Sequence, residues 1–245
     1  QSFTMGKRPG VRRRGRGGMQ FRAAATQKLK PAKYPSFSLD EERKGEIIDL
    51  VHESGRDVPL SKVRFEDGAI SFIPAPLGTK VGQRISFGLN SEIIDGNVIS
   101  IQNIPDGTIV CNVEKQFGDG GSFIKTAGAD ATVFSHADDG VILKLASGKF
   151  KKLNPKNRAM IGTLAGGGVE DRPFMRAGVK MMRFKSKGQK YPIVRGVAQA
   201  AYVHPHGGGR HQHVGQSSTV SRDATPGAKV GSIAARKTGR ARIKE

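Results

Sequence analysis

The chain has 245 residues, of which 36% are hydrophobic and 6% aromatic, with 33 glycines and 12 prolines, so only a modest core can form. Its 41 Lys and Arg against 21 Asp and Glu give a formal net charge of +20. The single cysteine, Cys111, excludes an intramolecular disulfide framework and a four-thiolate zinc site.

Charge is concentrated at the two ends of the chain. Residues 1–33 contain 10 Lys and Arg and no Asp or Glu, residues 34–148 contain 10 against 17, and residues 149–245 contain 21 against 4. Such a surplus repels itself in a compact protein, so a nucleic acid is the expected partner. The alternative, a membrane-surface protein, needs a basic amphipathic helix, and Gly and Pro interrupt the basic segments here.

The first segment, residues 1–34, shows no hydrophobic periodicity. It contains the run Arg12-Arg13-Arg14-Gly15-Arg16, and further basic residues follow up to Lys33. Sequences of this kind are extended or unordered until they bind. We therefore expect a basic N-terminal extension.

The middle of the chain predicts β structure. Residues 63–66 and 69–73 alternate between apolar and polar side chains around Asp67-Gly68, which predicts a β-hairpin. Further short strands are expected at 47–51, 85–87, 98–101, 109–113, 131–134, 141–145 and 149–153. Many short strands with frequent glycine turns are typical of small barrels. Pro105-Asp106-Gly107 divides them into domains at 35–105 and 106–170.

Two details of this middle region carry expectations of their own. Cys111 lies within the apolar run 108–113, which predicts a buried strand cysteine and not a reactive thiol. The glycine clusters at 118–121 and 166–168 lack the Lys-Ser/Thr of a P-loop, so nucleotide binding is not indicated, and the first cluster is expected to form a tight turn.

Beyond residue 170 regular patterning largely disappears. Residues 171–245 are expected to form an extended basic arm, with only short helices such as one around 233–236. Lysines and arginines between 180 and 195 are interleaved with Phe184 and Tyr191, the combination of charge and flat apolar ring that accepts an unstacked RNA base. This composition is equally compatible with binding to DNA.

Four of the six histidines fall within residues 204–213. Paired His-x-His spacings can surround zinc, but this stretch contains no acidic residue to serve as general base or further ligand. Gly207, Gly208 and Gly209 would let backbone approach phosphate while the histidine rings and Arg210 stack or donate. We favour an RNA-contacting loop over a zinc site.

Several strings resemble one family, the ribosomal protein L two family of the large subunit, in its archaeal and eukaryotic form. They run nearly end to end and include Arg14-Gly15-Arg16-Gly17, Ile104-Pro105-Asp106-Gly107, Cys111-Asn112-Val113-Glu114, Arg158-Ala159-Met160-Ile161-Gly162, Val194-Arg195-Gly196-Val197-Ala198, His204-Pro205-His206-Gly207-Gly208-Gly209 and Ala234-Ala235-Arg236-Lys237-Thr238-Gly239-Arg240.

The resemblance implies an OB-fold barrel followed by an SH3-like barrel, with long basic arms that enter large-subunit ribosomal RNA. It also implies a place near the peptidyl transferase region and the intersubunit face, and support for assembly, subunit association and tRNA placement. The family's histidine in that region falls on His204. The usual Asn and acidic residue before it are replaced here by Ala200 and Val203, which weakens a general-base role for His204.

The sequence thus predicts a mainly β, non-enzymatic RNA-binding protein with no cofactor and no metal. No run approaches the roughly 18 apolar residues of a membrane span, and no secretory signal is apparent, so a cytoplasmic place in the large subunit is expected. The expected partners are large-subunit rRNA, other ribosomal proteins, the small subunit and nearby tRNA. Alternatives from other classes are a zinc-dependent RNA-processing enzyme and a DNA-compacting protein.

The residues expected to bind RNA are basic side chains from both ends together with members of the histidine stretch. They are Arg12, Arg13, Arg14, Arg16, Arg22, Lys180, Arg183, Lys185, Lys187, Arg195, His204, His206, Gly207, Gly208, Gly209, Arg210, His211, His213, Arg222, Arg236, Lys237 and Arg240. No catalytic residue is expected, beyond an indirect role for His204.

Overall fold

The computed structural model describes residues 18–23, 28–36, 42–89, 91–137, 139–225 and 227–235. The chain divides into two compact units. We call residues 25–175 the β unit, and residues 1–24 with 176–245 the basic unit.

The two units differ in net formal charge. The basic unit contains 22 Lys and Arg against 2 Asp and Glu, whereas the β unit contains 19 of each kind. The β unit is therefore neutral in formal charge, and the entire surplus of +20 belongs to the basic unit. In the sequence-based division, residues 34–148 have a negative net charge because that division ends before the lysines at 149–156, which belong to the β unit.

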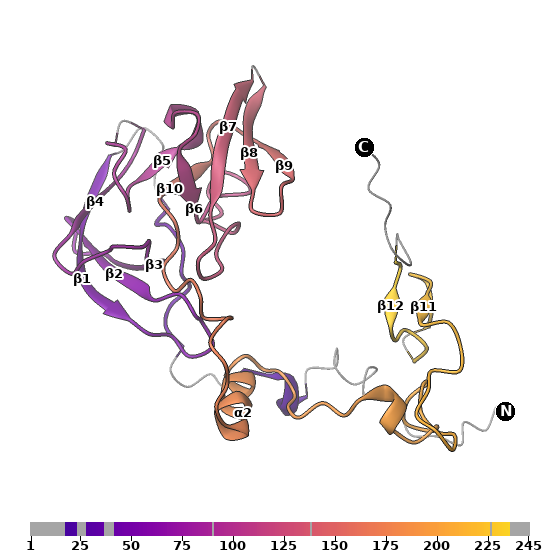
Figure 1. Cartoon of the computed structure of the whole chain (residues 1–245). Coiled ribbons are helices and arrows are strands. Elements are labelled where there is room, and N and C mark those ends of the chain that lie inside the picture. The colour runs from indigo at the N-terminus through magenta and orange to yellow at the C-terminus, as the bar shows by residue number, and fades with distance from the viewer. Residues whose placement is uncertain are drawn as a thin grey trace. The chain divides into compact units, whose positions relative to one another are not determined.

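The β unit is built on one continuous ten-stranded sheet in the order β3-β2-β1-β4-β5-β10-β6-β7-β8-β9 (Figure 1). Its strands are β1 (Arg43–Val51), β2 (Leu60–Phe65), β3 (Ile70–Pro74), β4 (Arg84–Phe87), β5 (Val98–Ser100), β6 (Ile109–Cys111), β7 (Ala131–Ala137), β8 (Gly140–Leu145), β9 (Phe150–Leu153) and β10 (Arg158–Ile161). Adjacent strands are antiparallel, apart from the parallel pair β4 and β5. The mainly β character expected from the sequence is confirmed.

The predicted hairpin forms as expected. Strands β2 and β3 pair antiparallel, with Val63 opposite Ser71. Gly68 has a φ of +79°, a conformation that side chains disfavour, and its N–H donates to Phe65 O at 2.9 Å. The Asp67 carboxylate accepts from Ala69 N at 3.0 Å, which closes the turn.

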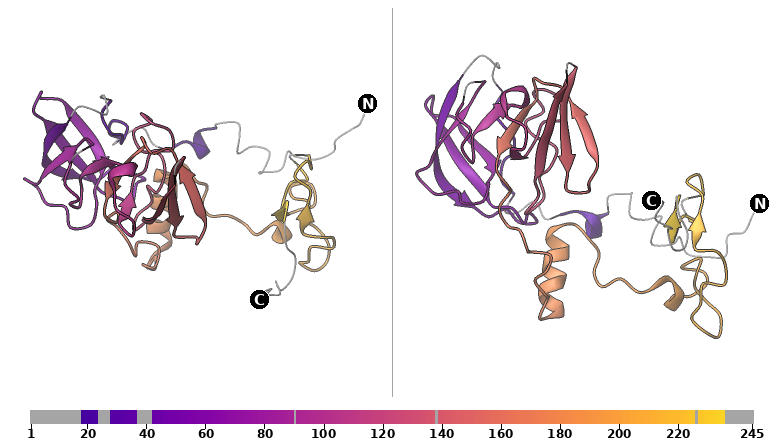
Figure 2. Two further views of the ribbon diagram at one scale, coloured as in Figure 1. Left: turned by 90° about the horizontal axis from the view of Figure 1, so that it is seen from above. Right: turned by 45° about the horizontal axis from the view of Figure 1, so that its top comes forward.

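Two hydrophobic cores lie within the β unit, and three short strands contribute to both. Met160 of β10 packs in the first core with Phe65 and Phe87, whereas its neighbours Ala159 and Ile161 pack in the second. In β5 and β6 adjacent residues divide between the cores in the same way. Figure 1 shows β5, β10 and β6 between β1–β4 and β7–β9, and the views in Figure 2 show the early, indigo strands and the later, salmon strands on opposite sides of the β unit. Because strand side chains alternate between faces, these strands form a wall shared by the cores.

Every strand expected from the sequence is present, at slightly different bounds. Strand β10 was not expected as a strand. All four of its residues are buried, because both of its faces are covered, so it shows no alternation of polar and apolar residues. It also begins with a charged side chain, Arg158.

Cys111 is the buried strand cysteine that the sequence predicts, with 0% exposure at the end of β6. Burial, with smaller contributions from Asp130 and Asp95, raises the pKa of its thiol from 9.0 to about 12. An unfolded chain loses this proton near pH 9 while the folded chain keeps it. The unfolded state is therefore favoured increasingly as pH rises above 9.

We expect the free energy of unfolding to fall by up to about 1.4 kcal/mol per pH unit through this thiol alone. Urea unfolding of the reduced chain at pH 8, 9 and 10, compared with Cys111→Ala, measures it. Contributions of other titrating groups are common to both proteins and cancel in the difference. The prediction would be contradicted if the free energy of unfolding changed equally with pH in the wild-type chain and in Cys111→Ala.

Residues 31–36 belong to the β unit, although the sequence-based division placed most of them in the N-terminal extension. Lys33 N donates to Phe72 O at 3.1 Å, and Tyr34 N donates to Gly120 O at 2.9 Å. The Tyr34 hydroxyl donates to Asn112 O at 2.5 Å, and its ring is 4% exposed within the first core. This part of the segment is therefore ordered by the protein itself, in contrast to the expectation of an arm that orders on RNA.

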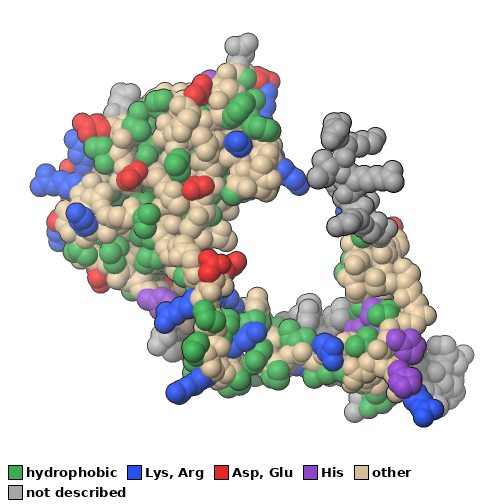
Figure 3. Space-filling model, viewed as in Figure 1, with side chains coloured by type: hydrophobic (Ala, Val, Ile, Leu, Met, Phe, Trp, Pro, Cys, Tyr) green, Lys and Arg blue, Asp and Glu red, His purple; other side chains and the backbone are tan. Residues whose placement is uncertain are grey.

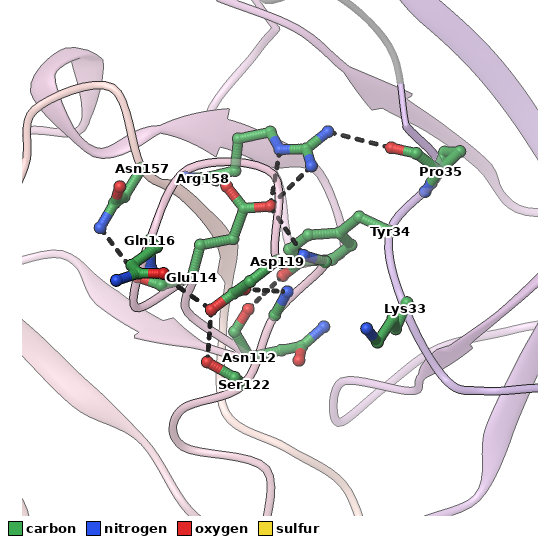
Figure 4. Close-up of polar contacts among 12 residues, drawn as sticks. Lys33, Tyr34, Pro35, Asn112, Glu114, Gln116, Asp119, Ser122, Asn157 and Arg158 are labelled. Atoms are coloured by element: carbon green, nitrogen blue, oxygen red, sulfur yellow. Dashed lines mark hydrogen bonds and ion pairs between the residues drawn. The ribbon is translucent and has the colours of Figure 1, made fainter.

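A buried ion pair secures the same segment (Figure 4). Arg158 Nη2 lies 2.6 Å from Glu114 Oε1, with the two side chains 4% and 0% exposed. The Arg158 Nη1 donates to Pro35 O at 3.1 Å, and the guanidinium lies 5.5 Å from the centre of the Tyr34 ring. Arg158 therefore holds this segment through its hydrogen bond to Pro35 O and its contact with the Tyr34 ring, while its charge is paired with Glu114.

The glycine cluster at 118–121 forms the expected turn beside this ion pair. Gly118 and Gly120 have φ values of +83° and +80°. Asp119 accepts from Ser122 Oγ at 2.6 Å and from backbone N–H groups, including Gly121 N at 2.9 Å (Figure 4). Burial alone would raise the pKa of Asp119, but these hydrogen bonds outweigh it and lower the pKa.

The basic unit contains little regular structure. Its elements are the 3-10 helix η1 (Met19–Phe21), the helix α2 (Ala177–Ser186), the 3-10 helix η3 (Gly196–Ala198), and the parallel strands β11 (Thr219–Val220) and β12 (Ser232–Ile233). None of the helices in the described parts of the chain is long and apolar enough to cross a membrane. The helix expected around 233–236 is wrong for the described residues, because Ile233 pairs with Val220 and Ala234 has a φ of +49°.

Candidate nucleic-acid interface

Helix α2 presents the first group of predicted RNA-binding residues. Lys180, Arg183 and Lys185 lie on it, and Lys187 follows at its end. No residue of α2 is buried. Arg183 and Lys185 in the last turn interact favourably with the negative end of the helix dipole. Gly188, with a φ of +68°, then ends the helix.

Two aromatic rings and one ammonium group form a cluster beside α2. The Phe184 and Tyr191 ring centres are 5.4 Å apart. The Lys180 Nζ lies 5.9 Å from the first ring centre and 5.6 Å from the second, which is the distance of a cation–π interaction. The interleaving of charge and ring that the sequence indicates is thus a real spatial cluster.

Gly188 also lies against a segment that is distant in the sequence, residues 21–23. A Cβ at this position would lie 2.7 Å from Ala23 N and 3.0 Å from Phe21 O, so only glycine permits this approach. As a result, Arg22 and Lys185 line one cleft of about 490 Å³. Sequence reasoning named both residues but did not indicate that they meet.

The histidine stretch forms a compact turn around His204. Val203 N and His204 N both donate to Ala200 O, at 2.9 and 3.2 Å. The His204 ring lies against Gly196, where a Cβ would be 2.1 Å from ring atom Cε1. The absence of a side chain at Gly196 therefore leaves the space that this imidazole occupies.

The two nitrogens of His204 have different surroundings. Its Nδ1 accepts from His206 N at 3.0 Å, so a neutral ring carries its proton on Nε2. Desolvation, together with the neighbouring His206, lowers the pKa of His204 below its usual value. The lowered pKa favours the neutral ring, in which Nε2–H is a donor and Nδ1 already accepts from His206 N. This arrangement suits a hydrogen-bond donor better than a general base.

His206 has a structural place in the turn. It is 9% exposed, and its ring centre lies 5.2 Å from that of His204, edge to face. Its Nε2 is buried without a hydrogen-bond partner among the described residues. A Cβ at Gly231 would be 3.6 Å from its Cε1, so this ring packs where β12 begins.

Two of the three glycines after His206 are required by close contacts within the turn. A Cβ at Gly207 would lie 2.4 Å from Gln199 O, and one at Gly208 would lie 2.8 Å from Ala201 Cβ. At Gly209 the nearest atoms are 3.6 Å away, although its φ is +83°. The first two glycines therefore serve close approach within the turn, whereas the sequence suggested close approach to phosphate.

The remaining predicted residues of this unit are exposed. Arg210, His211, His213, Arg195 and Arg222 all lie at the surface. His213 Nδ1 lies 2.8 Å from His211 O, and Arg195 Nη2 donates to Gln212 Oε1 at 3.3 Å. In the space-filling view, Lys, Arg and His side chains recur over the basic unit, whereas most visible Asp and Glu lie on the β unit (Figure 3).

Seven predicted residues lie outside the described residues: Arg12, Arg13, Arg14, Arg16, Arg236, Lys237 and Arg240. Within the described ranges, no three His, Cys, Asp or Glu side chains are grouped so that they could hold a metal ion. The cleft residues Met19, Gln20, Ala23, Met181 and Gln189 were missed. They are uncharged, and no periodicity in the sequence marks them.

Comparison with known proteins decides the family. A family model described as "Ribosomal Proteins L2, C-terminal domain" matches residues 94–226, which is more than half of the chain. The chain belongs to the ribosomal protein L2 family. The resemblance stated from the sequence strings is therefore confirmed.

Members of the ribosomal protein L2 family match this chain almost end to end. One from Cenarchaeum symbiosum, named large ribosomal subunit protein uL2, is 75% identical over 241 residues, which are 98% of this chain and 99% of that protein. One of the same name from Nitrosopumilus maritimus is 75% identical over 242 residues, with the same coverage. A third, from Korarchaeum cryptofilum, is 48% identical over 238 residues, 97% of each chain. These relatives are archaeal, as the resemblance implied.

Proposed function

We propose that this chain is a non-enzymatic structural constituent of the large ribosomal subunit that binds large-subunit rRNA. The observation that carries the proposal is the placement of the entire formal surplus of +20 in the basic unit, beside a neutral β unit. A polyanion such as RNA neutralises such a surface. Family membership and the printed names of the relatives support the same conclusion.

The proposed architecture keeps the domains expected from the sequence. Residues 35–105 would form an OB-fold barrel and residues 106–170 an SH3-like barrel, with basic arms at 1–34 and 171–245. The two hydrophobic cores support a pair of barrels. The arms would carry most rRNA contacts, through the 22 basic, histidine and glycine positions named above, including those outside the described residues.

The finer placement follows from the resemblance. The chain would lie near the peptidyl transferase region and the intersubunit face, beside other ribosomal proteins, the small subunit and tRNA. There it would support assembly, subunit association and tRNA placement in the cytoplasm. The neutral His204, with Nε2–H as a donor and Nδ1 already accepting, favours a positioning contact to RNA over proton transfer.

Sedimentation of the tagged, full-length chain in lysate from its own cells tests the proposal most directly. The chain should sediment with the large ribosomal subunit, resist DNase and return to the top of the gradient after RNase. A DNA-compacting protein would respond to DNase instead. A zinc-dependent RNA-processing enzyme would contain stoichiometric zinc in the purified protein, which metal analysis detects.

Replacing His204 by Ala tests the positioning role. We expect subunit joining to fall about fivefold, the effect of one lost hydrogen bond of about 1 kcal/mol, with little change in the chemistry of particles that assemble. Subunit association is measured by sedimentation, and peptide-bond formation by single-turnover reaction of the purified ribosomes. Normal joining and tRNA placement with greatly reduced peptide-bond formation would overturn this view.

A further inference from the structure

The cleft of about 490 Å³ in the basic unit is formed by segments that are far apart in the sequence. One segment is the N-terminal stretch around η1, and the other runs from α2 to Tyr191. Its volume falls within the roughly 300–1,000 Å³ that is typical of small-ligand sites. Because Gly188 allows the two segments to touch, the cleft is a built feature of this unit.

The lining combines two kinds of side chain. Met19, Met181 and Tyr191 provide apolar and aromatic surface, with the two methionines 90% and 48% exposed. Arg22, Lys185 and Lys190 provide positive charge. A nucleotide has the complementary pair of features, namely a flat base that stacks on an aromatic ring and a phosphate that accepts from cations.

Among the described residues, no acidic side chain pairs with these cations. Residues 172–222 contain ten Lys and Arg and no Asp or Glu. Within the described part of the chain, no ion pair is found for Arg22, Lys185 or Lys190. An apolar peptide would fill the floor of the cleft but would leave this charge unmatched, so a ligand with a phosphate fits better.

We propose that this cleft binds one unstacked nucleotide of large-subunit rRNA. Its base lies against Tyr191 and Met181, and its phosphate lies among Arg22, Lys185 and Lys190. The inference rests on the proposed function, since it names a site for the same RNA. It differs from the phosphate contacts of the arms, because it requires a base to leave its stack.

A matched pair of variants on α2 tests the inference. Met181 lines the cleft, whereas Met182 does not line it and is 65% exposed. Met181→Glu and Met182→Glu change the net charge equally, but only the first places a carboxylate in the cleft, where it replaces apolar contact with the base and repels the phosphate. We expect Met181→Glu to bind large-subunit rRNA transcripts about tenfold more weakly than Met182→Glu does.

Chemical probing and crosslinking locate the nucleotide. With the full-length wild-type chain, one base that is reactive in free rRNA should become protected, and zero-length ultraviolet crosslinks should map to residues 19–23 or 181–191. Tyr191→Leu, which keeps apolar bulk but removes the aromatic face, should restore the reactivity of that base. Phe150→Leu, at an exposed ring of the β unit, should leave it protected. Circular dichroism checks that each variant is folded.

The outcomes separate this inference from the proposed function. Equal rRNA affinities of folded Met181→Glu and Met182→Glu, with no crosslink in the cleft, would overturn the nucleotide site while leaving rRNA binding intact. Crosslinks from the cleft to another ribosomal protein, with none to RNA, would also overturn it. Absence of rRNA binding by the wild-type chain would overturn the proposed function as well.

Discussion

Affinity of the full-length chain for a large-subunit rRNA fragment is expected to fall about a thousandfold or more when monovalent salt rises from about 50 to about 200 mM. Each Lys or Arg that meets a phosphate releases condensed counterions, which adds about 0.7 to 0.9 to the slope of log affinity against log salt. The basic unit offers 22 such side chains against 2 acidic ones, so six to ten contacts of this kind are available to it.

Filter binding or fluorescence anisotropy across a salt series measures this slope. Lys185→Gln, in the basic unit, should lower the slope by about one. Lys144→Gln, on β8 of the neutral β unit, is the matched control and should leave the slope unchanged. A wild-type slope near one would contradict the proposal that the basic unit binds RNA through many phosphates.

Replacement of Arg158 by Ala is expected to lower the free energy of unfolding by about 3 to 5 kcal/mol. The substitution leaves the carboxylate of Glu114, which is 0% exposed, buried without its cation. It also removes the hydrogen bond to Pro35 O and the contact with the Tyr34 ring, which hold the segment 31–36. Urea unfolding followed by circular dichroism measures the loss.

An exposed ion pair in the same unit provides the control. Arg64 Nη2 lies 3.4 Å from Glu46 Oε2, with the side chains 57% and 47% exposed. Pairs of this kind contribute about 0 to 1 kcal/mol, so Arg64→Ala should have little effect. Adding Glu114→Gln to Arg158→Ala should recover part of the loss, because it removes the unpaired charge. Equal effects of Arg158→Ala and Arg64→Ala would contradict the prediction.

Local signals in the sequence predict the elements of the β unit well. Asp67-Gly68 between two alternating segments is sufficient for the hairpin, because the turn chemistry and the strand period agree. Cys111 is predicted to be buried because its neighbours are apolar. The strand β10 is missed because burial on both faces removes the alternation that marks a half-buried strand.

The basic unit is less predictable, because few of its elements are determined by local sequence. Helix α2 has no buried residue and no side-chain hydrogen bond at its N-terminal cap. The sequence therefore contains neither an apolar stripe nor a capping residue from which this helix could be predicted. The helix expected near 233–236 is replaced by a parallel pairing of Ile233 with Val220, a contact that local propensity cannot indicate.

The residue types of the candidate site are also predictable from the sequence, whereas their spatial grouping is not. Charge, aromatic rings and the histidine stretch are visible in the sequence as residue types. Their grouping depends on close approaches of distant segments, at Gly188 against residues 21–23 and at Gly196 against His204. These approaches explain why the sequence did not indicate the cleft.

The wall shared by the two hydrophobic cores has a consequence for how the β unit unfolds. Residues of β10 that alternate between the cores cannot leave one without disturbing the other. Two domains joined only by a linker could unfold one after the other, whereas the β unit should lose its structure in a single cooperative transition. We therefore expect the two regions that the sequence divides near residue 105 to unfold together, since they share β10, a strand of four residues.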